Sequence, residues 1–128
     1  MKYRMLMPML LLVTAPYALH ANPLPIHPFM FEKLEYDYQW YGHMRNANAT
    51  LTRAVPSGTP FWNALDTLRN AGARCAGEDR DPRLARCTYS ERITINDYYS
   101  ADAVWTVLLH LEDGKAVNVT MSRDIDER

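Results

Sequence analysis

The chain has 128 residues, of which 48% are hydrophobic and 11% aromatic, with 14 basic and 15 acidic side chains. The hydrophobic content excludes a disordered chain, and the near-neutral charge excludes a nucleic-acid-binding protein held by phosphate neutralisation. The length suits one small domain.

The first 21 residues match the three-part pattern of a removable export signal. Lys2 and Arg4 form its basic start, an apolar stretch follows, and Ala21 ends a small-residue cleavage site. The apolar stretch is shorter than the roughly 20 residues that cross a bilayer, so no membrane span is expected after cleavage. Removal of the signal leaves 12 basic and 15 acidic residues. The sequence therefore predicts a periplasmic or secreted protein.

A lead segment rich in proline and aromatic residues follows, at residues 22–57. Its prolines favour an extended start. Residues 36–40 alternate at period two, which predicts a strand with an aromatic face, and a short helix over residues 31–38 is the alternative. The polar residues 42–55 lack periodicity and are expected to form a mobile connection. The aromatic part of this segment either adds an edge strand to the domain or packs beneath its sheet.

The aromatic side chains of the lead segment have two possible uses. They cover the core of the domain, or they form an exposed surface for a protein partner, because tyrosine and tryptophan are enriched at interfaces. The candidates for such a surface are Tyr36, Tyr38, Trp40 and Tyr41.

Residues 60–71 have the clearest helix pattern in the chain. Thr59 is the expected N-cap, Pro60 the first helical residue, and Gly72 the left-handed residue that ends the helix. Apolar residues recur at spacings of three and four, so one face of the helix must be buried. These residues are Phe61, Ala64, Leu65, Leu68 and Ala71.

Cys75 and Cys87 are the two cysteines of the chain. In an exported protein such a pair predicts one disulfide, which closes a loop of about 13 residues and adds roughly 3 kcal/mol of stability in the chain-entropy model. The enclosed residues 76–86 mix acids and arginines, which predicts a solvated loop rather than a metal site. This loop supplies a second set of candidate partner-binding residues, namely Arg80, Asp81 and Arg83.

Three runs rich in β-branched and aromatic residues predict strands, at residues 87–95, 103–111 and 116–122. Together with the helix they predict an α+β fold for residues 58–128. Its two layers are one main helix and an antiparallel β-meander of three or four strands, with one disulfide.

The register of the last hairpin depends on the turn between Glu112 and Lys115. A two-residue loop places Val107 opposite Thr120 and splits the apolar residues between the two faces. A three-residue loop places Val107 opposite Val119 and produces one apolar face that can receive the helix, so the three-residue loop is preferred.

Residues able to support catalysis are few. Asp97, Asp102 and His110 are the candidates for a small periplasmic hydrolase, but no nucleophile elbow, phosphate-binding loop or HExxH motif accompanies them. The structural interpretation is favoured for all three, with the two aspartates as turn residues between strands and the histidine as an ordinary residue on a strand surface. We therefore expect no catalytic site, no metal site and no cofactor.

The helix and the last hairpin share short motifs with a known family. Gly58-Thr59-Pro60 opens the helix, Asn70-Ala71-Gly72 closes it, and Trp105-Thr106-Val107 and Asp113-Gly114-Lys115 follow. This arrangement, over residues 58–121, resembles the small periplasmic modules of the BamE/SmpA family. The resemblance implies a helix-on-sheet fold and a non-catalytic adaptor role in outer-membrane assembly.

The sequence thus predicts a non-enzymatic periplasmic module that binds a protein partner in the cell envelope, and no nucleic acid. The alternative is an immunity protein or enzyme inhibitor. In that case the disulfide-closed loop of residues 76–86 would enter the active site of the target, because a bridged loop loses less entropy on binding.

Overall fold

The computed structural model describes residues 29–127. The expected export signal, residues 1–21, and the proline-rich start of the lead segment lie outside the described residues. Within residues 29–127, no helix is long and apolar enough to cross a membrane.

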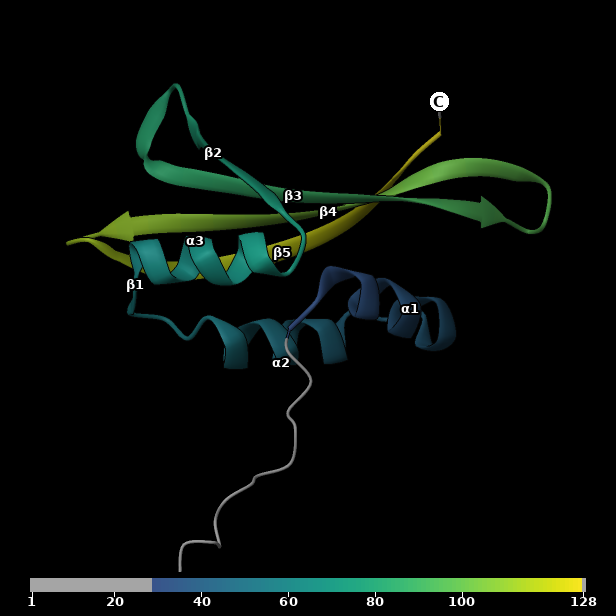
Figure 1. Ribbon diagram of the computed structural model, residues 1–128, viewed down its shortest axis with the longest axis horizontal. Coiled ribbons are helices and arrows are strands. Elements are labelled where there is room, and N and C mark those ends of the chain that lie inside the picture. Colours follow the sequence, from purple (N-terminus) through teal and green to yellow (C-terminus); the bar gives the residue numbers. More distant parts are fainter. Residues whose placement is uncertain (1–28, 128) are drawn as a thin grey trace, which may run out of the picture.

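In the part of the chain that the structure describes, three helices cover one face of a five-stranded antiparallel sheet (Figure 1). The strand order is β1-β5-β4-β3-β2, so the consecutive strands β2 to β5 form a meander that contains the three predicted strands. The two-layer α+β class is confirmed, with two more helices and at least one more strand than predicted. The helices are α1, Phe31–Tyr41, α2, Arg45–Ala54, and α3, Phe61–Asn70. The strands are β1, Thr59–Pro60, β2, Arg74–Glu78, β3, Asp81–Ile95, β4, Tyr99–Glu112, and β5, Lys115–Asp126.

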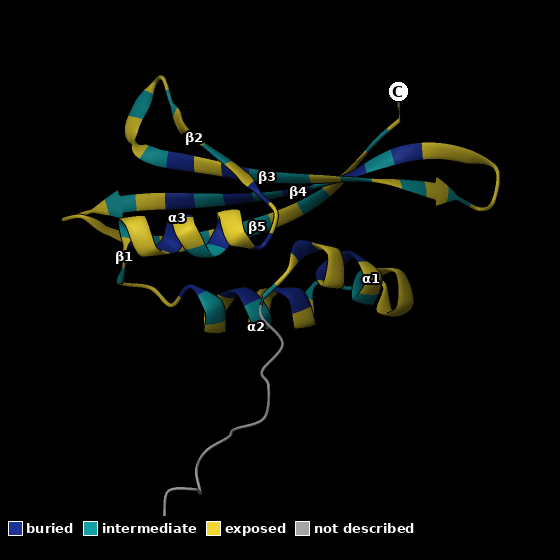
Figure 2. Ribbon diagram, in the orientation of Figure 1, coloured by how far each residue is buried: buried dark blue, intermediate teal, exposed yellow. Residues whose placement is uncertain are grey.

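The hydrophobic core lies between the helices and the sheet, where the buried segments of both layers face each other (Figure 2). The lead segment packs beneath the sheet, because Phe31 of α1 stacks on Tyr89 of β3 with ring centroids 5.4 Å apart. The backbone N–H of Phe31 also donates to the carbonyl oxygen of Ala71, 3.1 Å away, which ties the start of α1 to the end of α3. The lead segment and the disulfide-bridged unit therefore share one core.

The strand predicted at residues 36–40 is wrong, and the helical alternative is correct. This segment forms α1, whose buried side chains Phe31, Leu34 and Glu35 recur at helical spacing. Gly42 ends the helix with a left-handed backbone, φ +70°, and donates its N–H to the carbonyl oxygen of Tyr38, 2.7 Å away.

The mobile connection predicted for residues 42–55 is also wrong, because α2 occupies most of it. Ala47 and Leu51 are buried one helical turn apart, and Val55 is buried just after the helix. Two buried side chains in α2 are too few to give a clear periodic pattern in the sequence. The helix therefore depends on its packing against the rest of the domain.

The predicted helix at residues 60–71 is confirmed as α3, and Gly72 is left-handed as expected, with φ +110°. The N-cap prediction is wrong, since Pro60 is the N-cap residue. Thr59 instead donates from Oγ1 to the carbonyl oxygen of Pro56, 2.6 Å away, and pairs with Ala116 of β5. The two residues before α3 thus form the short edge strand β1.

The predicted disulfide joins Cys75 and Cys87, which lie directly opposite each other on β2 and β3. The solvated loop expected at residues 76–86 is instead most of a β-hairpin. An ion pair between Arg86 Nε and Glu78 Oε1, 2.6 Å apart, spans its two strands. The disulfide therefore crosslinks neighbouring strands rather than closing an irregular loop.

The preferred register of the last hairpin is wrong. Asp113 and Gly114, with φ of +52° and +76°, form a two-residue turn. A bulge at Asn118, φ +50°, then inserts one extra residue into β5 opposite β4. Beyond the bulge, Val107 lies opposite Met121 and Trp105 opposite Arg123. The bulge shifts β5 by one residue, which keeps one continuous core face and turns Arg123 towards α1.

Candidate partner-binding surfaces

A buried carboxylate anchors α1 to the sheet. Glu35 is fully buried and accepts four hydrogen bonds, each 2.8 Å long. Trp105 Nε1 and Arg123 Nε donate to Oε1, while Arg123 Nη2 and Gln39 Nε2 donate to Oε2. The pair with Arg123 is bidentate, the geometry that best compensates the desolvation of two charges.

These contacts keep Glu35 ionised. Burial alone would raise the pKa of its carboxyl group, but the hydrogen bonds from Arg123, Gln39 and Trp105 outweigh burial and lower that pKa below its ordinary value. The Arg123 guanidinium also lies 4.1 Å from the centre of the Tyr38 ring, a cation–π contact. Together these contacts fix the rotation of α1 about its own axis.

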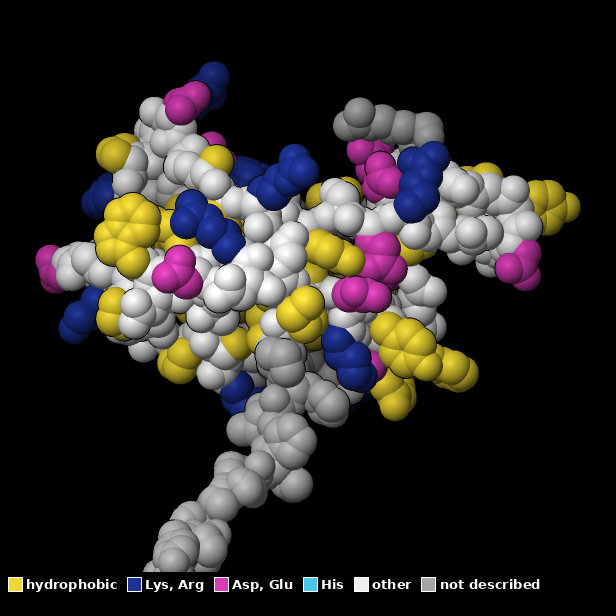
Figure 3. Space-filling model, viewed as in Figure 1, with side chains coloured by type: hydrophobic (Ala, Val, Ile, Leu, Met, Phe, Trp, Pro, Cys, Tyr) yellow, Lys and Arg dark blue, Asp and Glu magenta, His cyan; other side chains and the backbone are white. Residues whose placement is uncertain are grey.

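With this rotation, three large aromatic side chains of α1 point into solvent. Tyr36 is 59% exposed, Trp40 71% and Tyr41 63%. We call these three residues the aromatic face of α1. The ring centroids of Tyr36 and Trp40 are 6.3 Å apart. Figure 3 shows hydrophobic side chains projecting over the α1 end of the molecule.

An ion pair accompanies the aromatic face. Lys33 Nζ lies 2.7 Å from Asp37 Oδ1, one helical turn away, and 5.7 Å from the centre of the Tyr36 ring. Tyr38, the fourth aromatic residue predicted for this surface, lies on the other side of α1, where its ring meets Trp105 edge to face at 6.1 Å. The structure thus brings together three of the four predicted residues on the aromatic face of α1. The fourth, Tyr38, packs against the sheet beside Trp105 and Arg123.

The second predicted set, Arg80, Asp81 and Arg83, lies at the tip of the β2–β3 hairpin. Asp81 Oδ1 accepts the backbone N–H of Arg83 at 2.9 Å and lies 3.8 Å from Arg83 Nε. This tip projects at the opposite end of the molecule from α1 (Figure 1). The two predicted sets therefore form two separate surfaces.

The residues considered for a hydrolase do not meet. Asp97 occupies the β3–β4 turn with a left-handed backbone, φ +58°, and Asp102 forms an ion pair with Arg92, 3.2 Å apart. His110 lies eight residues from Asp102 along β4, about 26 Å at roughly 3.3 Å per strand residue. Asp102 and His110 therefore cannot act on one substrate atom.

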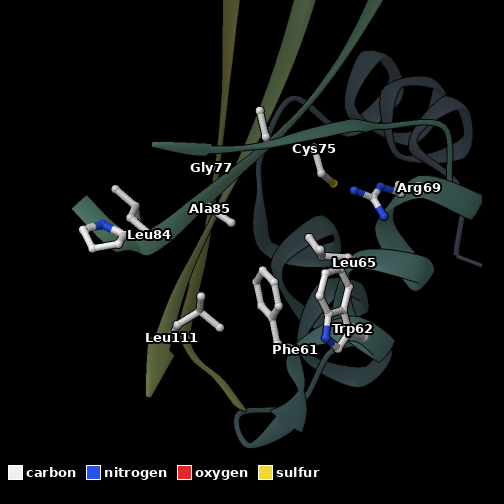
Figure 4. Close-up of a pocket in the computed structure, with 11 residues that line it drawn as sticks. Phe61, Trp62, Leu65, Arg69, Cys75, Gly77, Leu84, Ala85 and Leu111 are labelled. Carbon is white, nitrogen blue, oxygen red and sulfur yellow. The ribbon is translucent and has the colours of Figure 1, made fainter. Parts of the chain in front are cut away.

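A cavity lined by none of the predicted partner-binding residues lies between α3 and the β2–β3 hairpin (Figure 4). Its volume is about 350 Å³, and its walls are mostly apolar. Trp62, which is 69% exposed, and Arg69 line the edge formed by α3. The available signal was the placement of Trp62, an aromatic residue on the polar side of an amphipathic helix.

Known proteins provide no assignment for these surfaces. Comparison of the chain with protein-family models, with curated proteins and with solved structures found no match. We therefore assign the surfaces from their own chemistry.

Proposed function

We propose that the protein is a non-enzymatic, exported protein-binding module that contacts its partner through the aromatic face of α1. The observation that carries this proposal is the exposure of Tyr36, Trp40 and Tyr41 on one firmly oriented helix. Tyrosine and tryptophan dominate the binding energy of protein interfaces, because they bury large areas and lose few rotamers.

The anchor beneath α1 supports the same proposal. Glu35 and Arg123 hold the helix from its inner side, so the aromatic side chains are presented on a rigid element. A surface that is ordered before binding loses less entropy when the partner docks. The contacts within the core thus lower the cost of forming an interface on the outside.

The disulfide and the N-terminal sequence pattern support export. Disulfides persist in oxidising compartments such as the bacterial periplasm, and the first 21 residues have the composition of an export signal. The proposed partner is therefore a protein of the cell envelope, in keeping with the adaptor role implied by the resemblance to BamE/SmpA modules.

Affinity capture from envelope extract tests the proposal, with the oxidised protein as bait and mass spectrometry of the retained proteins. Trp40→Ala is the test variant, and Trp62→Ala is its matched control, because the two tryptophans are almost equally exposed on different helices. We expect one envelope protein to be retained by the unmodified protein and by Trp62→Ala, but not by Trp40→Ala. Equal retention by both variants, or no specific retention, would contradict the proposal.

The inhibitor or immunity role remains the second candidate, favoured by the crosslinked hairpin whose charged tip projects from the sheet. In that case the Arg80→Ala, Arg83→Ala double variant would lose the partner while Trp40→Ala kept it. The same capture experiment therefore separates the two roles.

A further inference from the structure

The cavity between α3 and the β2–β3 hairpin has the size and lining of a small-ligand site. Its volume of about 350 Å³ falls in the range of pockets that hold small organic molecules. The Phe61 ring points into it, with Leu65 on one side and Leu111 on the other (Figure 4). Burial of an apolar group here would remove these side chains from water.

Two small residues, Gly77 and Ala85, are part of the cavity wall. Gly77 of β2 lies opposite Ala85 of β3, so the two positions share the inner face of the sheet. Gly77 is exposed, and a Cβ atom built on it would meet no heavy atom within 4 Å, so a larger side chain at this position could extend into the cavity. The pairing of β2 with β3 also shifts register between Gly77 and Glu78, and a glycine inside a strand is typical both of such a bulge and of a place where a ligand approaches the backbone closely.

The positively charged side chain of Arg69 lies at the edge of the cavity. Arg69 is exposed in the last turn of α3, and its guanidinium extends towards Cys75 at the edge of the cavity (Figure 4). Among residues 29–127 no carboxylate forms an ion pair with Arg69, and no acidic residue lines the cavity. A guanidinium with its donors available binds a carboxylate by two parallel hydrogen bonds.

We propose that this cavity binds an amphiphilic organic acid, with the acyl chain or ring among the apolar walls and the carboxylate on Arg69. The charge of Arg69 and the absence of lining acids select an anion over a neutral or cationic amphiphile. The site is separate from the aromatic face of α1, because α1 and α3 lie towards opposite ends of the molecule (Figure 1). The inference therefore does not depend on the proposed protein partner.

Isothermal titration calorimetry with octanoate tests the site, with 1-octanol as the uncharged probe of equal chain length. We expect saturable binding of one octanoate per oxidised protein, and binding of 1-octanol at least about tenfold weaker, because a charge-assisted hydrogen bond is worth roughly a factor of ten. Unsaturable binding, no binding, or equal affinity for the two probes would overturn the proposal.

Two variants locate the bound probe. Gly77→Leu fills the cavity and is expected to abolish octanoate binding, whereas Ser90→Leu, on an exposed position of β3, is expected to leave it unchanged. Arg69→Gln is expected to weaken octanoate about tenfold and to leave 1-octanol unchanged. Its control is Arg53→Gln, at the equivalent last-turn position of α2.

Thermal unfolding accompanies each titration. If Gly77→Leu is unfolded, the octanoate affinity of Arg69→Gln alone tests the site. This variant should fold, since the exposed Arg69 side chain contributes little to the core. Octanoate binding that persists unchanged in Arg69→Gln would overturn the assignment of the carboxylate. Binding that persists in a folded Gly77→Leu variant would overturn the assignment of the cavity.

Discussion

Replacing Glu35 by glutamine removes the charge that anchors α1 and leaves the shape of the side chain unchanged. Each carboxylate oxygen faces two donors, with Arg123 contributing one donor to each oxygen. In either orientation of the new amide, its NH₂ group would therefore face two hydrogen-bond donors and no acceptor. The variant leaves the Arg123 guanidinium, whose side chain is only 10% exposed, without a countercharge.

The expected cost is large for a domain of this size. Removing one partner of a buried ion pair costs about 3–5 kcal/mol, and a small domain has about 5–15 kcal/mol of stability in total. Because 1 kcal/mol corresponds to about 4–8 °C for a chain of this length, Tm should fall by at least about 12 °C.

Thermal unfolding followed by circular dichroism measures this shift. Asp37→Asn is the matched control, since it breaks the exposed ion pair with Lys33 on the same helix and should change Tm little. Equal Tm values for Glu35→Gln and Asp37→Asn would refute the role of Glu35 as the anchor.

Three further predictions concern stability. Because the pKa of Glu35 is lowered in the folded protein, the unmodified protein should be more stable than Glu35→Gln above the ordinary carboxyl pKa of about 4.5. That advantage should shrink as the pH falls below 4.5, and urea titrations showing an advantage independent of pH would count against it. Reduction of the Cys75–Cys87 disulfide should lower stability by roughly 3 kcal/mol, and an unchanged Tm in reductant would contradict the crosslinking role. Asn118→Val should lower the free energy of unfolding in urea by about 1–2 kcal/mol, because a β-branched residue disfavours the left-handed backbone. Asn118→Gly should not lower it, and equal losses for the two variants would exclude this explanation of the bulge.

The elements with strong local patterns were predictable from the sequence. The helix α3 has apolar residues at regular spacing and a glycine at its end, and the long strands are rich in β-branched residues. The disulfide followed from the number of cysteines and the export pattern. In each case the determining residues lie close together in the chain or belong to one residue type.

The misassigned helix α1 shows where local pattern fails. Glu35 occupies an inward position that an apolar residue would normally fill, so the helical spacing of the buried residues is interrupted. Its partner Arg123 is 88 residues away, and only their contact makes a buried charge acceptable. The alternation of Tyr36, Tyr38 and Trp40 then resembled a strand.

The hairpin register depended on a single residue. Without a bulge, a two-residue turn splits the apolar residues between two faces, and the bulge at Asn118 restores one continuous apolar face. Asparagine adopts the left-handed backbone more readily than most residues, so Asn118 was the available signal.

The candidate surfaces were predictable in composition but not in arrangement. The aromatic residues of α1 could be chosen from the sequence, yet the assignment of Tyr38 to the anchor requires the rotation of the helix against the sheet. The cavity combines residues of α3, β2, β3 and β4, so no local pattern describes it.

The dissociation constant of the captured envelope protein, measured for the Trp40→Ala and Trp62→Ala variants, tests the proposed function most directly. Truncation of a tryptophan at the centre of an interface costs about 2 kcal/mol or more, which is roughly a 30-fold loss of affinity. We predict that loss for Trp40→Ala and an unchanged affinity for Trp62→Ala. Equal affinities for the two variants would contradict a partner bound on the aromatic face of α1.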